Sequence, residues 1–182
     1  MVDSPEPDCW LHADVEVRRS AIEGLGLFAT RSIAVGTVVS RLGGQFVSGQ
    51  QLADLFAATA SDPRRPYIDT ITVENDLHLV LPPRQASGPG RQAIGYGNHS
   101  CDPNLWWMSP YELAVRRPVS AGDELTNDYA MSTAEPGFVM QCSCGSPLCR
   151  RVITGDDWRR AELRERYEQH WVPALLTRIR AT

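Results

Sequence analysis

The chain has 182 residues, of which 42% are hydrophobic and 22% are charged, and this length and balance suit one packed domain. Its net charge of −4 argues against direct nucleic-acid binding, which normally needs a basic face, and suits a basic peptide as partner. No apolar run approaches the roughly 18 residues of a membrane span or the core of a signal peptide. We therefore expect a cytoplasmic protein that contacts no membrane, and we make no prediction of its oligomeric state.

Short apolar and β-branched runs separated by Gly and Pro predict many short strands. In chain order, the candidate strands are 14–18, 36–40, 67–73, 78–81 and 113–116. Between the second and the third, Ser48 and Gln51 form a capping-box pattern, which predicts a short helical insert at about 48–62. The sequence therefore predicts a mostly β fold with a helical interruption.

The C-terminal stretch predicts a helix with Asp156 or Asp157 as its N-cap. Apolar residues recur there at every fourth position, which predicts one buried stripe. The stripe consists of Leu163, Tyr167, Trp171, Leu175 and Ile179. Pro173 interrupts the pattern and should kink or restart the helix, because proline has no N–H to donate. The sequence shows no internal repeat and no linker long enough to separate two domains.

Three of the five cysteines, Cys142, Cys144 and Cys149, lie in one short block. Such close spacing does not readily satisfy disulfide geometry among all three, but loops with Gly and Pro can wrap thiolates around a tetrahedral ion. Cys101 is the best candidate for a fourth ligand, and His99 is the alternative. A partly disulfide-bonded cluster in a secreted protein is the other interpretation, which the lack of an export signal disfavours. We predict one zinc site.

Four blocks, in this order, resemble the SET-domain protein lysine methyltransferases. They are GLGLFA at 24–29, NHSCDPN at 98–104, GDELTNDY at 122–129 and CSCGSPLCR at 142–150. The second and fourth blocks are highly specific, the third is fairly specific, and the first is weak alone. The resemblance extends from about residue 15 to residue 151, and we expect a small bacterial member of the family.

The resemblance implies a mostly β SET-domain fold, in which small curled sheets surround a pseudoknot. In that crossing, the segment 98–104 passes beneath the loop that carries Tyr129. The implied organisation is a polar N-terminal tail at 1–13 and a SET domain at 14–135, which includes the helical insert. A zinc-binding post-SET segment at 136–154 and a C-terminal helical tail at 155–182 complete the chain.

The resemblance also implies S-adenosylmethionine as cofactor, in an outward pocket, with the lysine of a protein substrate entering a narrow channel from the opposite face. The expected cofactor-binding residues are Glu23, Gly24, Leu25, Gly26, Tyr96, Asn98, His99 and Trp158. The glycines would let the main chain approach the ligand closely, and Trp158 would cover it. Asn98 and His99 would bind its adenine and amino-acid portions through backbone and side chain, or would satisfy buried backbone groups at the crossing, or both.

Tyr129 matches the catalytic tyrosine of the family, whose hydroxyl would orient the amine and polarise the methyl group. The reaction is an in-line displacement, so the protein must align a neutral amine with the methyl carbon and exclude water. An apolar channel beside a sulfonium lowers the pKa of that amine. Asn127 shares the substrate channel and departs from the family, which commonly has Tyr or Phe there and so limits the number of methyl groups. Arg151 is a second departure, where Gly is usual.

Other functions also fit parts of the sequence. The compact insert at 48–62 leaves little surface for reading a peptide, which favours a methyltransferase that acts on a small-molecule amine. An inactive cofactor-binding or peptide-binding module is a further alternative. Gly24, Gly26 and Ala29 also match a dinucleotide-binding fingerprint, but that motif requires a following helix and an acidic residue about 20 positions on. A turn and a strand follow instead, so we expect no nicotinamide cofactor.

Overall fold

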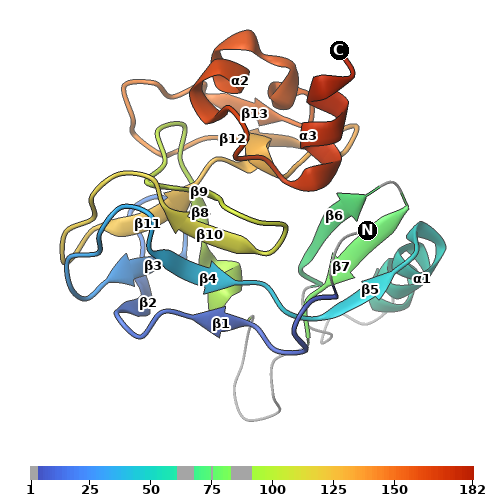
Figure 1. Ribbon diagram of the computed structural model, residues 1–182, viewed down its shortest axis with the longest axis horizontal. Helices are drawn as coiled ribbons and strands as arrows, with labels where there is room; N and C mark the ends of the chain where they lie inside the picture. The colour runs from blue at the N-terminus through green and yellow to red at the C-terminus, as the bar shows by residue number, and fades with distance from the viewer. Residues whose placement is uncertain (1–3, 61–67, 75, 83–91) are drawn as a thin grey trace.

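The computed structural model describes residues 4–60, 68–74, 76–82 and 92–182. Short strands in small sheets are the main regular structure, with helices in the C-terminal region and one helix in the insert (Figure 1). The mostly β class predicted from the sequence is therefore confirmed. Residue 67 of the third candidate strand and residues 61 and 62 of the predicted insert lie outside the described residues.

The first sheet contains four antiparallel strands in the order β1-β4-β10-β9. Their bounds are β1 Trp10–Leu11, β4 Val38–Arg41, β10 Glu112–Val115 and β9 Leu105–Trp107. The register against β4 shifts between Leu113 and Ala114, and such a bulge bends a strand and increases its twist. Strands β4 and β10 confirm the predictions at 36–40 and 113–116, and they form the centre of a curled sheet.

The second sheet has the order β2-β3-β11-β8. Its strands are β2 Val15–Arg19, β3 Leu25–Ala29, β11 Glu124–Asn127 and β8 Asn98–His99. Strand β8 runs parallel to β11, with Asn98 beside Thr126 and His99 beside Asn127, whereas the other pairs are antiparallel. The parallel pair brings the second and third motif blocks side by side, ahead of Tyr129.

Buried Asn104 binds the end of the segment 98–104 to β11. Its Nδ2 donates to the carbonyl of Glu124 at 2.8 Å, and its Oδ1 accepts from the amide of Thr126 at 2.9 Å. The amide of Ser100 donates to the carbonyl of Asn127 at 3.0 Å. The segment 98–104 is thus bound to β11 at both of its ends, and its passage beneath the loop that carries Tyr129 stays a prediction.

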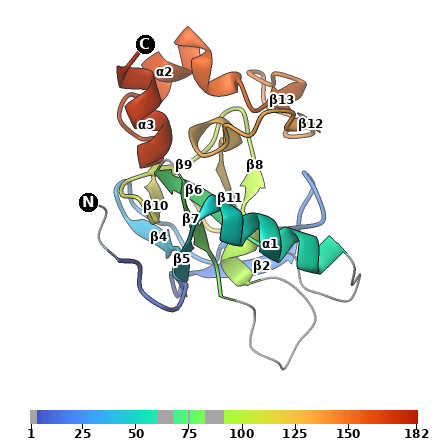
Figure 2. The same ribbon diagram turned by 90° about the vertical axis from the view of Figure 1, so that its right-hand side faces the viewer.

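The predicted helical insert belongs to a larger third unit beside these sheets, and from here on the insert means this whole unit (Figures 1 and 2). It consists of β5 Gln45–Val47, α1 Gly49–Ala60, β6 Thr70–Glu74 and β7 Leu77–Val80, with the strand order β5-β7-β6. The amide of Ser48 donates to Gln51 Oε1 at 2.8 Å, and the amide of Gln51 donates to Ser48 Oγ at 3.3 Å. The predicted capping box is therefore confirmed.

The C-terminal elements lie over the first two sheets (Figure 1). They are the antiparallel pair β12 Val139–Gln141 and β13 Val152–Thr154, the 3₁₀ helix η3 Asp157–Arg159, and the helices α2 Ala161–Tyr167 and α3 Pro173–Arg180. The predicted helix start at Asp156 or Asp157 is wrong for the α-helix, because a separate 3₁₀ turn occupies 157–159. Pro173 restarts the helix as predicted, at a position where its missing N–H costs no helical hydrogen bond.

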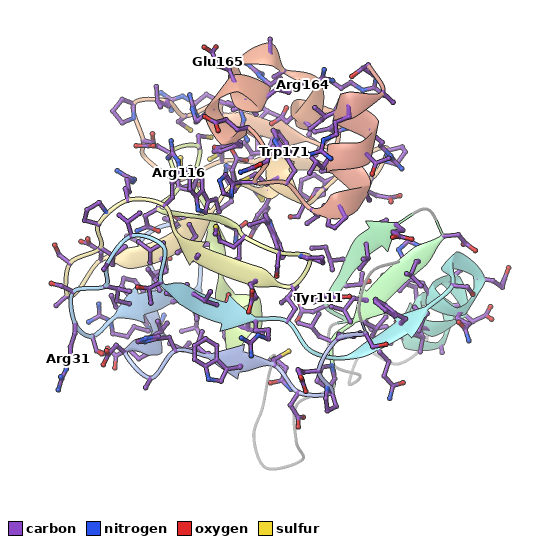
Figure 3. All side chains as sticks on the ribbon, viewed as in Figure 1. Arg31, Tyr111, Arg116, Arg164, Glu165 and Trp171 are labelled. Carbon is purple, nitrogen blue, oxygen red and sulfur yellow. The ribbon has the colours of Figure 1, made fainter. Side chains whose placement is uncertain are left out.

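The predicted apolar stripe attaches this region to the rest of the core. Leu163, Tyr167, Trp171 and Leu175 are all buried, and Ile179 is partly buried. Trp171 lies on the inner side of the C-terminal region, whereas Glu165 lies on its outer side (Figure 3). The stripe therefore faces the sheets. None of the helices in the described part of the chain has the length and apolar character needed to cross a membrane.

Candidate functional site

Two cavities meet at Tyr129. The smaller, of about 140 Å³, is lined by Ile22 and Glu23, by Asn98 and His99 of β8, by Tyr129, and by residues 140–143. The larger, of about 720 Å³, is also lined by Tyr129 and by Met140. We call them the small pocket and the large chamber. One tyrosine therefore borders both spaces, as a residue acting between a cofactor and an acceptor must.

Apolar side chains from two parts of the fold line most of the large chamber. Leu105, Trp107 and Leu113 reach it from the first sheet, and Phe56 and Ile71 reach it from the insert. Asn127 lines the chamber together with Tyr129, so both residues predicted for the substrate channel border one space. The chamber is nevertheless wider than the narrow channel that the family resemblance implied.

Tyr129 is fixed at both ends. Its hydroxyl donates to the carbonyl of Gly97 at 3.1 Å, and its amide donates to His99 Nδ1 at 3.2 Å. The side chain of Asp128 accepts from the amide of Ala130 at 3.0 Å and caps the 3₁₀ turn η2, Tyr129–Met131. The phenol oxygen is therefore held at the boundary between the two cavities.

The ring of His99 binds other groups of this chain through both of its nitrogens. The side chain is 3% exposed, and burial lowers its pKa to about 4 despite the nearby carboxylate of Asp128, so the ring is neutral at physiological pH. Because Nδ1 accepts from the Tyr129 amide, the proton lies on Nε2, which faces Cys101 Sγ at 3.3 Å. Both nitrogens therefore have protein partners, which favours the second of the two predicted roles and leaves only the main chain of His99 for a cofactor.

The side chain of Asn98 holds the glycine-containing loop. Its Nδ2 donates to the carbonyls of Glu23 and Leu25, both at 3.1 Å, and to Glu124 Oε1 at 2.7 Å. A Cβ on Gly26 would overlap the Glu124 carboxylate and crowd Asn98. A side chain at position 26 would therefore displace the Glu124 carboxylate from Asn98, and the cofactor contact predicted for the main chain of Gly26 is a separate proposal.

Several predicted cofactor residues lie outside the small pocket. Trp158 is 4% exposed, and the guanidinium groups of Arg159 and Arg164 lie 4.6 Å and 5.6 Å from the centre of its ring. Tyr96, in the 3₁₀ helix η1 Ala93–Tyr96, packs against the core. The residues of 23–26 other than Glu23 do not line the pocket either. We therefore leave Trp158, whose ring is covered by this chain's own arginines, out of the proposed cofactor site.

The four predicted metal ligands come together. The Sγ atoms of Cys101, Cys142, Cys144 and Cys149 all lie within 4.8 Å of one another. Cys101 Sγ and Cys142 Sγ are 3.8 Å apart, which matches the edge of about 3.8 Å of a tetrahedron with Zn–S bonds of about 2.3 Å. The donor set and its spacing fit a structural zinc ion.

The electrostatics of the cluster also favour a cation. Burial raises the pKa of the Cys101 thiol to about 11, although the Arg150 amide donates to its Sγ at 3.3 Å. Burial acts in the same direction at Cys144, but the amides of Cys101 and Ser146 outweigh it and lower that pKa to about 7. Four adjacent thiolates repel one another, so a bound divalent cation is needed to keep them all deprotonated.

A buried ion pair connects this cluster with the residue before Tyr129. The guanidinium of Arg150 donates to both oxygens of Asp128, at 2.6 Å and 2.7 Å, and the Tyr167 hydroxyl donates to Asp128 Oδ2 at 2.8 Å. Side-chain exposure is 0% for Asp128 and 6% for Arg150. Burial alone would raise the pKa of Asp128, but the hydrogen bonds from Arg150 outweigh it and lower that pKa. We call this pair the Asp128 clamp.

Sequence reasoning missed this clamp, although both residues lie inside the motif blocks. Arg150 follows the ligand Cys149, and its Nε lies 2.9 Å from Asp157 Oδ2, close enough for an ion pair but not aligned for a hydrogen bond. Arg150 therefore joins the cysteine segment, the turn before α2 and the residue before Tyr129. The spacing of residues along a sequence does not predict a contact that three separate segments make.

Arg151, which stands where the family usually has Gly, has a backbone conformation that favours glycine. Its φ of 68° lies in the left-handed region, which glycine adopts without steric conflict and other residues adopt rarely. A glycine at this position in the family therefore fits the turn that follows the last cysteine. Here an arginine holds the same conformation, at the end that leads into β13.

The comparisons agree with the fold and the arrangement of the blocks. The family profile described as SET domain matches residues 24–130, so the chain belongs to the SET domain family. It is 29% identical over 152 residues to "Histone-lysine N-methyltransferase ash1" of Drosophila melanogaster, a match that covers 80% of this chain and 6% of that protein. The chain therefore spans only a small part of this relative.

Two further matches differ in what they cover. "Methyltransferase flvH" of Aspergillus flavus is 40% identical over 89 residues, which is 44% of this chain and 50% of that protein. The structure of KRYPTONITE in complex with mCHG DNA and SAH superposes with a TM-score of 0.55 at 23% identity, covering 78% of this chain and 29% of that chain. At this identity the structural likeness establishes the fold.

Proposed function

We propose that this protein transfers a methyl group from S-adenosylmethionine to the side-chain amine of a lysine in a basic, histone-like protein. The observation that carries the proposal is the pair of cavities that meet at Tyr129. Membership of the SET domain family supports it, as do relatives named histone-lysine N-methyltransferases. The net charge of −4 suits a basic protein substrate.

The small pocket supplies the cofactor side of this proposal. Glu23, the main chain of Asn98 and His99, and residues 141–143 would hold S-adenosylmethionine, which provides a methyl group activated on a positively charged sulfur. Ligand pockets usually measure about 300–1,000 Å³, so a pocket of about 140 Å³ encloses only part of the cofactor. The remainder would lie along the loop that the Asn98 side chain holds.

The large chamber supplies the acceptor side. Its apolar walls disfavour an ammonium ion, so they lower the pKa of an entering amine and favour the neutral, nucleophilic form. The Tyr129 hydroxyl, already held by the Gly97 carbonyl, would accept from that amine and orient it, and the Asn127 amide offers a second polar contact. The nitrogen lone pair then forms the C–N bond as the C–S bond breaks, and the surplus proton leaves to solvent.

The cysteine segment has a structural role in this proposal. Cys101, Cys142, Cys144 and Cys149 would hold one zinc ion, which would join the crossing to a post-SET segment at 136–154. Through the Asp128 clamp, the ordered segment would then help to hold Tyr129 in position. The cytoplasmic location and the division of the chain into these segments remain predictions from the sequence.

The test measures transfer of a labelled methyl group from S-adenosylmethionine to lysine-containing histone peptides. All 18 basic residues of this chain are arginine, so label on lysine can only be on the added peptide. Matched peptides with arginine in place of lysine provide the control. Labelling of the lysine peptide alone supports the proposal, and equal labelling of both peptides contradicts it.

A further inference from the structure

The large chamber has more space than a lysine side chain needs. A lysine presents an unbranched stem of four methylene groups, for which a narrow channel suffices. The chamber measures about 720 Å³, which lies within the range of about 300–1,000 Å³ typical of sites that enclose a whole small molecule. Its volume therefore indicates an acceptor with a body larger than that stem.

The chemistry of the walls restricts what this body can be. Phe56 and Thr59 of α1 contribute to the wall, together with Ile71 of β6 and Leu81 after β7. Among the described residues that line the chamber, Asp69 alone carries a charge. The chamber thus offers a ligand apolar surface to bury and one negative charge, which together suit an amine with an apolar body.

Asn127 widens the end of the chamber near the reaction. It lines the chamber beside Tyr129, at the position where the family commonly has a larger aromatic residue. Met140, which lines both cavities, has a flexible side chain that adapts to different shapes. The passage between the cavities is therefore bordered by a small amide and an adaptable thioether.

We propose a further activity for the same site: methylation of a free amine that carries an apolar, arylalkyl-sized body, which the chamber has room to hold. The inference rests on the proposed methyl transfer and adds an acceptor class to it. The amine nitrogen forms the C–N bond while the C–S bond of S-adenosylmethionine breaks. The bonding electrons stay on sulfur, which gives S-adenosylhomocysteine, and the amine proton passes to solvent.

The test compares three acceptors with the same labelled cofactor and the zinc-loaded chain. 2-Phenylethylamine has an apolar body, ethanolamine has a primary amine without one, and a lysine peptide represents the proposed protein substrate. We expect kcat/KM for 2-phenylethylamine to exceed that for ethanolamine by at least about 10-fold, because the phenyl ring is buried in the chamber. Equal kcat/KM values for the two amines would overturn the inference.

A variant that fills the chamber provides the second measurement. Thr59 lines the chamber from α1, whereas Ala57 on the same helix is exposed and does not line it. We expect Thr59→Trp to raise KM for 2-phenylethylamine by about 10-fold, while Ala57→Trp leaves it unchanged. In Thr59→Trp, KM for the lysine peptide should rise by a smaller factor than KM for 2-phenylethylamine, because the lysine stem fills less of the chamber, and melting temperatures check that both variants are folded.

The outcomes separate the inference from the proposed function. If the lysine peptide is methylated and 2-phenylethylamine is not, the further activity is wrong and the proposed function stands. If S-adenosylhomocysteine does not bind and no acceptor is methylated, the proposed function fails, and the inference fails with it. A Thr59→Trp effect on both acceptors alike would show that they do not differ in their use of the chamber.

Discussion

Replacing Arg150 by methionine should destabilise this protein far more than the loss of an ordinary surface ion pair. Arg150→Met keeps much of the side-chain volume but leaves the carboxylate of Asp128 buried without its two charged donors, which lie at 2.6 Å and 2.7 Å. Removing one partner of a buried pair costs about 3–5 kcal/mol, because the remaining charge is uncompensated. We expect the free energy of unfolding to fall by about that amount.

The assay is urea unfolding of the zinc-loaded chain within a double-mutant cycle. Asp128→Asn removes the charge but keeps one oxygen, which can accept from the Ala130 amide or from the Tyr167 hydroxyl, because these donors bind different oxygens of Asp128. The double variant with Arg150→Met should be more stable than Arg150→Met alone, by about 2 kcal/mol or more, because no buried charge remains.

The control is Arg117→Met. Arg117 is half exposed and lies 3.5 Å from Asp102, so its loss should cost less than about 1 kcal/mol. If Arg150→Met is no more destabilising than Arg117→Met, or if the double variant is less stable than either single one, the reasoning about the clamp is refuted.

Three further predictions concern the metal, the catalytic residue and pH. Metal analysis should find one zinc per chain, and chelation should disorder the segment around Cys142 before the sheets unfold; a zinc-free, fully ordered protein would contradict this. Tyr129→Phe should lower the single-turnover rate by about 100-fold or more while the cofactor Kd stays nearly constant, because an oriented hydroxyl acts mainly in the transition state; wild-type turnover would show the hydroxyl to be dispensable. The pKa of Asp128 is lower in the folded protein than in the unfolded chain, where it is about 4. The stability that this carboxylate contributes is therefore present above about pH 4 and is lost as the pH falls through the folded pKa. The free energy of unfolding, measured from pH 5 to pH 2, should thus depend less on pH in Asp128→Asn than in the parent protein.

The sequence predicted those features that depend on local patterns. The capping box at Ser48, the restart at Pro173 and the buried stripe of the C-terminal helices depend on neighbours a few positions apart, and all are present. The cysteine pattern also predicted which cysteines come together, including Cys101, which lies far from the other three in the chain. A motif retains information about distant contacts that periodicity does not.

Features set by tertiary contacts were not predicted. Strands β8, β9 and β11 are two to four residues long, too short to show a period, and β11 pairs with β3 and β8, which lie far away in the chain. The side-chain role of His99 depends on which atoms of Tyr129 and Cys101 reach its ring. Trp158 is covered by Arg159 of its own 3₁₀ turn and by Arg164 of α2, an arrangement that a tryptophan in a sequence does not reveal.

A variant of Asn98, whose side chain holds the loop at Glu23 and Leu25, tests the cofactor proposal most sharply. Asn98→Ala removes the donors to the Glu23 and Leu25 carbonyls, so the loop should lose its fixed position. Cofactor affinity should therefore fall even though the side chain itself need not touch the ligand. The Arg117→Met variant provides the control, because Arg117 does not line either cavity.

Calorimetric titration of the zinc-loaded chain with S-adenosylhomocysteine tests the central claim most directly. We predict binding at one site per chain, a rise in melting temperature with ligand concentration, and an affinity at least about 10-fold weaker in Asn98→Ala. NADH, titrated in parallel, should give no binding heat. If S-adenosylhomocysteine produces neither binding heat nor a rise in melting temperature, the assignment of this protein as a methyltransferase is contradicted.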